Sequence, residues 1–229
     1  MKSMIYEQQN IFIIDNFYSN PNAVRDYALS LPYKKDVMGN HFWRTTPRLN
    51  FNIVPLLEKY VGSKIVIDKN WKEHPVDEYV EMNMSFYKII NNPYDDYAHA
   101  NHIHHDFVHW TGIVYLSPDL PPNVGTQLWR HKPSGDEFAH GDDSFTSKIY
   151  TSDLSVNPEM YDNRGEDAVS PNGIVSNDWE KTDYMAYKYN RLVLFRGTMF
   201  HSSAHTKEVP DGDRLNQFFY FNQVPPNEK

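Results

Sequence analysis

Residues 101–117 read NHIHHDFVHWTGIVYLS, a run in which four histidines and an aspartate lead directly into an apolar stretch. The apolar part, residues 111–117, has the composition of a buried β-strand. If the histidine-rich part enters this strand in an extended conformation, residues two apart lie on one face, so His104 and Asp106 project together while His105 points away. The sequence therefore predicts an imidazole and a carboxylate side by side at the entrance to a strand.

Other parts of the chain also have clear secondary-structure patterns. A helix is predicted over residues 21–31, with Ser19 or Asn20 as its N-cap and Pro21 in its first turn, and a second helix around residues 53–60. Strands are predicted at residues 11–14, 79–90, 111–117, 191–196 and 214–222. No helices alternate with the later strands as a parallel α/β sheet requires, so we expect an antiparallel sandwich or barrel with flanking helices.

The chain of 229 residues is interpreted as one domain, residues 1–229. Residues 1–78 are expected to form an N-terminal helical support, and the β core is expected at residues 79–132 and 184–223. Between them, residues 133–183 are polar and rich in Gly, Ser, Asp and Asn, which predicts an insertion. Because loops of this length are usually lids, binding loops or disordered segments, a solvated insertion and a substrate-covering lid both remain open.

Composition excludes several classes of partner and chemistry. The net charge of −8 and the absence of a Lys/Arg cluster argue against nucleic acid as a partner. The chain has no cysteine, which excludes disulfides, thiolate nucleophiles and cysteine-ligated metals. No stretch approaches the roughly 18 apolar residues of a membrane span, so we expect a cytoplasmic protein. The sequence does not indicate an oligomeric state.

His201 is the candidate for a second metal-binding imidazole. A mononuclear non-haem iron(II) site needs two imidazoles and one carboxylate on one face of an octahedron, which leaves positions for a cosubstrate and dioxygen. His104 supplies one imidazole, and Asp106 supplies the carboxylate. His201 follows the strand 191–196 and a turn at Gly197, where an antiparallel strand would return across the same core.

Arg214 opens the last predicted strand and shares a face with Asn216 by the period of two. An arginine that points into an apolar barrel is costly unless it meets an anion. Its planar guanidinium suits a carboxylate held by two parallel hydrogen bonds. We therefore expect a dicarboxylate cosubstrate at Arg214.

His104-His105-Asp106, His201 and Arg214, with Tyr115-Leu116 closing the strand after the first motif, resemble the HxD…H…R/K signature of the Fe(II)/2-oxoglutarate-dependent oxygenase superfamily, in its prolyl-hydroxylase-like branch. The stretches HIHHDFVHWTGIVYLSP, GTQLWRHK, YNRLVLFRGTMFHSS and RLNQFFYF are similar to a bacterial and phage subgroup whose substrates are largely unassigned. This resemblance runs from about residue 15 to residue 221.

The resemblance implies a mainly β fold with flanking helices, namely a double-stranded β-helix of the jelly-roll, cupin-like kind. It also implies a dioxygenase that couples oxidative decarboxylation of 2-oxoglutarate to hydroxylation of an amino acid, a peptide side chain or a small metabolite. His104, Asp106 and His201 would bind Fe(II), and O₂ would be the second cosubstrate. Arg214 and Tyr115 would bind the C5 carboxylate of 2-oxoglutarate. Asn216 stands where many relatives have a serine and can also donate.

A different class of protein also accounts for the strands. A cupin-like or lectin-like jelly roll could bind a metal or a small ligand without turnover, because fold does not determine function. Arg214 distinguishes the oxygenase from this alternative, since a barrel that only binds a metal or a small ligand has no need of a buried cation away from its metal. No catalytic residue is expected beyond the metal ligands. Seven other histidines are expected at the surface, in support of the ligands, or without an assigned role: His99, His102, His105, His109, His131, His140 and His205.

Overall fold

The computed structural model describes residues 9–35, 42–45, 53–66, 84–89, 103–106, 108–139, 179–204 and 214–224. Outside these residues lie parts of two predicted segments, the strand at 79–90 and the insertion at 133–183, and also His99, His102, His140 and His205. The elements are β1 (Ile11–Ile14), α1 (Pro21–Ser30), β2 (Lys34–Lys35), β3 (Phe42–Arg44), α2 (Val54–Val61), β4 (Ile65–Val66), β5 (Phe86–Ile89), β6 (Trp110–Tyr115), the 3₁₀ turn η3 (Pro122–Val124), β7 (Thr126–His131), β8 (Trp179–Met185), β9 (Leu192–Arg196), β10 (His201–Ser203) and β11 (Arg214–Gln223).

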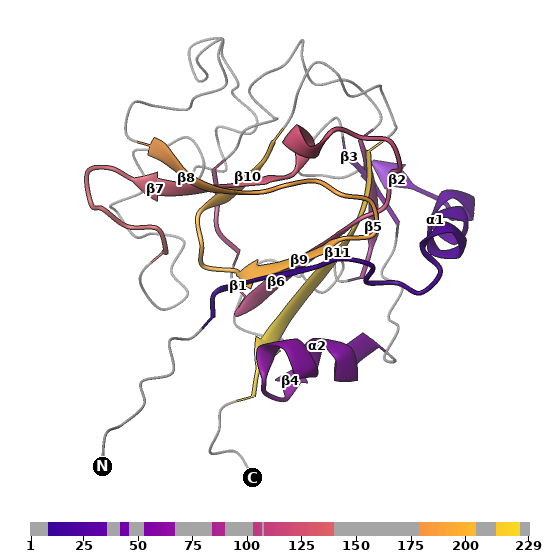
Figure 1. The fold of residues 1–229 in the computed structure, drawn as a ribbon, viewed down its shortest axis with the longest axis horizontal. Helices are drawn as coiled ribbons and strands as arrows, with labels where there is room; N and C mark the ends of the chain where they lie inside the picture. Colours follow the sequence, from indigo (N-terminus) through magenta and orange to yellow (C-terminus); the bar gives the residue numbers. More distant parts are fainter. Residues whose placement is uncertain are drawn as a thin grey trace.

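Two antiparallel sheets account for the strands in the described part of the chain. The larger has eight strands in the order β1-β9-β6-β11-β5-β3-β2, with β4 paired to β11. The smaller has the order β10-β7-β8. Figure 1 shows them as two layers, with β7, β8 and β10 on one side and β1, β6 and β9 on the other.

The chain crosses several times between the two sheets. The larger sheet contains β5, β6, β9 and β11, whereas the smaller contains β7, β8 and β10. A single bridge from His104 to His201 adds the segment between β5 and β6 to the edge of the smaller sheet. The order β5-β11-β6-β9 therefore faces the order His104-β10-β7-β8. This is the double-stranded β-helix, or jelly roll, so the predicted fold class is confirmed.

The larger sheet is buried on both faces, and its two faces serve different cores. On the outer face, Trp110, Val114 and Leu194 pack with Ala28 of α1 and Leu57 of α2. On the inner face, between the two sheets, side chains of β6 and β9 pack against side chains of the smaller sheet: Ile113, Tyr115, Val193, Phe195, Leu128 and Met185. Every residue of β6 is buried for this reason.

The two helices form as their sequences predict. Asn20 caps α1 by accepting a hydrogen bond from Ala23 N–H at 3.1 Å, and Pro21 occupies the first turn. Gly62 ends α2 in the left-handed conformation, with φ of 70°. No helix in the described ranges has the length and apolar composition that a membrane crossing requires.

The smaller sheet reaches further along the chain than the sequence patterns indicate. β8 begins at Trp179, so residues 179–183 of the predicted insertion are strand residues paired with β7. The β7 and β8 segments are short and mix polar with aromatic residues, which hides the alternation of a half-buried strand.

Candidate functional site

His104, Asp106 and His201 meet at the edge of the smaller sheet. The backbones of the two histidines exchange hydrogen bonds, with His104 N to His201 O at 3.0 Å and His201 N to His104 O at 2.8 Å. Asp106 Oδ2 lies 3.5 Å from His201 Nε2, and Asp106 Oδ1 lies 4.0 Å from His104 Nε2. One potential ligand atom from each residue falls within 4.8 Å of the others, so these three side chains could hold a metal ion.

These distances are compatible with one shared ion. Two atoms that each bind an ion at about 2.1 Å can lie at most about 4.2 Å apart. Both distances to the Asp106 carboxylate meet this limit. His104 also keeps an open side, because 43% of its side chain is exposed, whereas the other two side chains are buried. A ligand could therefore reach the site past His104.

The orientation of His201 is fixed by its other ring nitrogen. His201 Nδ1 lies 2.8 Å from Met199 O, and a carbonyl can only accept, so Nδ1 carries the hydrogen. Nε2 is then left with its lone pair toward Asp106, which is the form that binds a metal. Burial lowers the pKa of His201 well below its usual value and so favours this neutral imidazole. The Phe195 ring packs on His201 at 4.7 Å between centroids.

Asp106 is a buried carboxylate, only 4% exposed. Thr111 Oγ1 donates a hydrogen bond to its Oδ2. Burial raises the pKa of the Asp106 carboxyl, since removal from water disfavours the charged form. Buried charges in proteins are usually paired or coordinate a metal, so a cation between the two imidazoles would offset this cost.

The turn after β9 holds Asp106 in place through a close backbone approach. Asp106 N–H donates to Gly197 O at 2.7 Å. A Cβ atom at Gly197 would lie 2.2 Å from Val108 O, so only glycine fits here without a shift of the backbone. The glycine that the sequence marks as a turn residue also lets the two segments of the site touch.

Arg214 lies on the inner face of β11 and is 2% exposed. Its Nη1 donates to Ala204 O at 2.8 Å, and its Nη2 donates to Gly125 O at 3.3 Å. These carbonyls belong to the residues just after β10 and just before β7. Ala204 is three residues from His201, which places the guanidinium contact roughly 10 Å along the strand direction from the histidine.

Tyr115 and Asn216 share this inner face. They are directly opposite each other on β6 and β11. The Tyr115 hydroxyl forms a 2.9 Å hydrogen bond with Thr126 Oγ1. Burial raises the pKa of Tyr115, and the hydrogen bond with Thr126 and the positive charge of Arg214 oppose that rise. Asn216 Oδ1 is buried and has no hydrogen-bond partner among the described residues.

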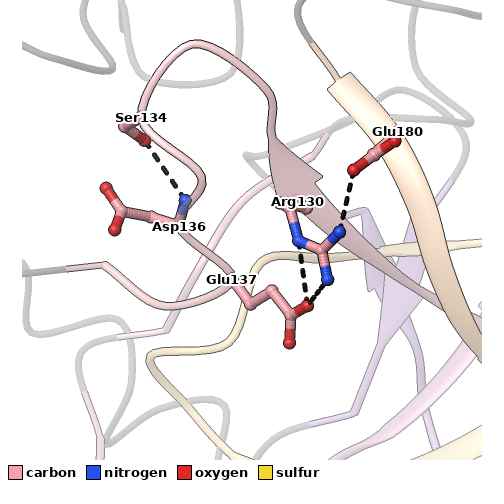
Figure 2. Close-up of polar contacts among 5 residues, drawn as sticks. All are labelled: Arg130, Ser134, Asp136, Glu137 and Glu180. Atoms are coloured by element: carbon pink, nitrogen blue, oxygen red, sulfur yellow. Dashed lines mark hydrogen bonds and ion pairs between the residues drawn. The ribbon is translucent and has the colours of Figure 1, made fainter.

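Other arginines near the smaller sheet have different partners. Figure 2 shows Arg130 of β7, whose guanidinium binds the carboxylates of Glu137 and Glu180, the latter at 2.9 Å. This arginine is 41% exposed and ties the turn after β7 to β8. In contrast with Arg130, Arg214 is buried and donates to main-chain carbonyls.

Sequence patterns missed several residues around Arg214. Thr126, Gly125 and Tyr184 gave no recognisable signal, although Gly125 and Thr126 open the stretch GTQLWRHK. None of the described histidines outside the triad joins the metal-binding group. His105 packs near the Phe200 ring at 6.1 Å, and His109 accepts a hydrogen bond from the main chain of β11.

The fold and site together define a double-stranded β-helix protein with a candidate metal centre inside its barrel. A protein-family model matches residues 1–214, and the chain belongs to that family, which is described as a family of unknown function (DUF6445). None of the curated protein sequences matches this chain.

Solved structures with a similar fold include HygX from Streptomyces hygroscopicus with nickel and 2-oxoglutarate bound, at 13% identity and a TM-score of 0.47. The same protein with nickel, 2-oxoglutarate and hygromycin B bound has 12% identity and a TM-score of 0.48. A third is the Fe(II)/α-ketoglutarate-dependent dioxygenase TqaL, at 10% identity and a TM-score of 0.40. Each comparison covers 96% of this chain and 85% of the other. Because the family description names no activity, the chemistry of this chain must be inferred from its own side chains.

Proposed function

We propose that this protein is an Fe(II)- and 2-oxoglutarate-dependent dioxygenase that hydroxylates an amino acid, a peptide side chain or another small molecule. One observation carries the proposal. A His-Asp-His group and a buried arginine face the interior of one barrel, roughly 10 Å apart along the strand direction. The triad fits a divalent ion, and the arginine fits the distal carboxylate of a cosubstrate that chelates the same ion.

His104, Asp106 and His201 would hold the iron through two imidazole nitrogens and one carboxylate oxygen. This donor set is typical of non-haem Fe(II) oxygenases, and it leaves coordination positions open. Bound iron would supply the redox chemistry that couples decarboxylation of 2-oxoglutarate, with consumption of O₂, to hydroxylation of the substrate and release of succinate. The chain itself contributes ligands, orientation and a barrel interior from which water is largely excluded.

Arg214 would bind the C5 carboxylate through its planar fork. Tyr115 lies within electrostatic reach of this guanidinium, and its hydroxyl is already in a hydrogen bond with Thr126. Asn216 faces the same interior with a buried amide. These residues would orient the cosubstrate so that its 2-oxo acid end meets the metal.

A jelly roll that binds metal without turnover is the second candidate, since the triad alone would suit it. Arg214 favours the enzyme, because a barrel that only binds metal has no anion that a buried guanidinium at that distance would bind. The two candidate functions differ because only the dioxygenase would bind 2-oxoglutarate at the metal and convert it to succinate.

The test uses the full chain loaded with Fe(II) without oxygen. Titration with 2-oxoglutarate should produce the visible absorption band of an iron chelate in the wild type, and Asp106→Ala should show none. Succinate release is then measured in air against pooled metabolites and peptides. Metal binding without a chelate band would refute the dioxygenase and leave the non-enzymatic jelly roll.

A further inference from the structure

One tyrosine hydroxyl holds the segment that joins η3 to β7. Tyr184, on β8, accepts a hydrogen bond from Gly125 N–H at 2.5 Å and donates one to Pro122 O at 2.6 Å. Its hydroxyl therefore bridges the first residue of η3 and the residue that follows η3. With both ends bound to a single oxygen, the turn has little freedom to change shape.

Gly125 is also pressed against the end of β8. A Cβ atom at this position would lie 2.0 Å from Met185 O and 2.8 Å from Tyr187 N. Tyr187, two residues after the end of β8, donates its N–H to Pro122 O at 2.9 Å, which adds a second link to the turn. The position of Gly125 is thus determined by β8, through main-chain contact on one side and the Tyr184 hydroxyl on the other.

The carbonyl of Gly125 is one of two main-chain carbonyls that accept hydrogen bonds from the Arg214 guanidinium. Gly125 O accepts from Ala204 N–H at 2.9 Å and from Arg214 Nη2 at 3.3 Å. Ala204 O accepts from Arg214 Nη1 at 2.8 Å. Both arms of the guanidinium are held by this pair of carbonyls, so the plane of the fork depends on where Gly125 lies.

We propose that Tyr184 is a positioning residue for cosubstrate binding: it holds Gly125 so that the Arg214 guanidinium presents its fork to the distal carboxylate of 2-oxoglutarate. This inference rests on the proposed function, because it assigns a role at the same cosubstrate site. Tyr184 itself would touch neither the metal ligands nor the cosubstrate. It acts through one main-chain carbonyl and one arginine.

The consequence is specific to the distal end of the cosubstrate. A carboxylate that binds an arginine in bidentate fashion needs the guanidinium plane in one orientation. Tyr184→Phe removes only the hydroxyl, so Gly125 N–H and Pro122 O lose a shared partner and the turn can shift. Affinity for 2-oxoglutarate should fall about 3- to 10-fold, which corresponds to about 0.6–1.4 kcal/mol. Affinity for a 2-oxo acid without a distal carboxylate should not change.

The experiment measures anaerobic binding to the Fe(II)-loaded full chain by the chelate absorption band. The two probes are 2-oxoglutarate and pyruvate, which share the chelating end but differ in the distal carboxylate. The matched control is Tyr189→Phe, which removes a tyrosine hydroxyl that binds Asn22 Oδ1 at 2.6 Å on a different part of the protein. Melting temperature and Fe(II) content are measured for every variant.

A second measurement separates positioning from general loss of structure. In an Arg214→Ala background, Tyr184→Phe should have no further effect on 2-oxoglutarate affinity, because its effect passes through the arginine. In the wild type, hydrogen exchange of peptides that contain residues 122–128 should slow with 2-oxoglutarate and not with pyruvate. This last measurement needs no variant to fold.

The outcomes distinguish a failure of the proposed function from a failure of the role proposed for Tyr184. A wild type that binds neither probe would refute the proposed function. A wild type that binds 2-oxoglutarate, with Tyr184→Phe equal to the wild type, would refute only the role of Tyr184. That role is likewise refuted if Tyr184→Phe weakens both probes equally, or if 2-oxoglutarate leaves the exchange of residues 122–128 unchanged. A selective fall in 2-oxoglutarate affinity that vanishes in the Arg214→Ala background would support it.

Discussion

Replacing Arg214 with alanine is the sharpest perturbation of the proposed cosubstrate site. The side chain is 2% exposed, so any carboxylate bound to it is largely removed from water. Truncating one partner of such a charge pair typically costs about 2–5 kcal/mol. At about 1.4 kcal/mol for each tenfold change, the dissociation constant for 2-oxoglutarate should rise by roughly 1.5 to 3.5 decades.

The same change should leave metal binding intact. The contact between Arg214 and Ala204 lies roughly 10 Å along the strand direction from His201, and none of the three candidate ligands hydrogen-bonds to the guanidinium in the contacts described. Stability should fall because Ala204 O loses a charged donor, which is worth about 1.5–3 kcal/mol. The assay is the anaerobic iron-chelate titration, with Fe(II) content and thermal melting measured on the same samples.

Arg130→Ala is the matched control. This arginine is 41% exposed, and its ion pairs with Glu137 and Glu180 lie at the surface, where water and salt screen such pairs. Its removal should change neither 2-oxoglutarate affinity nor Fe(II) content. Equal 2-oxoglutarate affinity in the wild type and Arg214→Ala would refute the assigned role of Arg214 and leave the triad as a metal site without a known cosubstrate.

Three further predictions concern the metal site and the fold. His104→Ala should abolish Fe(II) binding measured by metal analysis, whereas His102→Ala should retain it; the opposite result would reassign the ligand. Gly197→Ala should lower the melting temperature and the Fe(II) content together, because its Cβ would lie 2.2 Å from Val108 O and must displace the backbone that binds Asp106. Asp15→Asn should destabilise the protein by about 1 kcal/mol at pH 7, a value reduced for the partial exposure of its ion pairs with Lys188 and Arg191. Since these cations lower the pKa of that carboxyl from 3.8 to about 2, the melting-temperature difference should be constant above about pH 5 and disappear as the pH falls from 4 to 2.

The period-two argument predicted the face shared by His104 and Asp106 even though these residues are not part of a regular strand. β6 begins only at Trp110, and His104 contributes a single bridge to His201. The two side chains still meet because main-chain hydrogen bonds hold both residues in place, His104 to His201 and Asp106 to Gly197. A local pattern was sufficient here because the neighbouring strands impose the conformation that the pattern assumed.

The burial of Arg214 was also accessible from sequence, because it follows from alternation within one long strand. Residues 214–223 form a ten-residue strand that is paired on both sides. Because Arg214, Asn216 and Phe218 are two residues apart, they lie on the same face of this strand. The extent of the smaller sheet was harder to predict from the sequence. Its strands β7 and β8 are joined by a long segment, and their pairing is a contact between distant parts of the chain that neither strand's composition specifies.

The link from Tyr184 to Arg214 shows why some residues of the site give no signal in the sequence. Both of its steps involve main-chain atoms of Gly125: the Tyr184 hydroxyl accepts from Gly125 N–H, and Gly125 O accepts from the guanidinium. Every residue but proline has the same N–H and carbonyl groups, so no residue type at position 125 could signal either bond. Glycine there is explained by the main chain of Met185, which would lie 2.0 Å from a Cβ atom. That constraint exists only once β7 and β8 are paired, so the residues around position 125 cannot reveal it in the sequence.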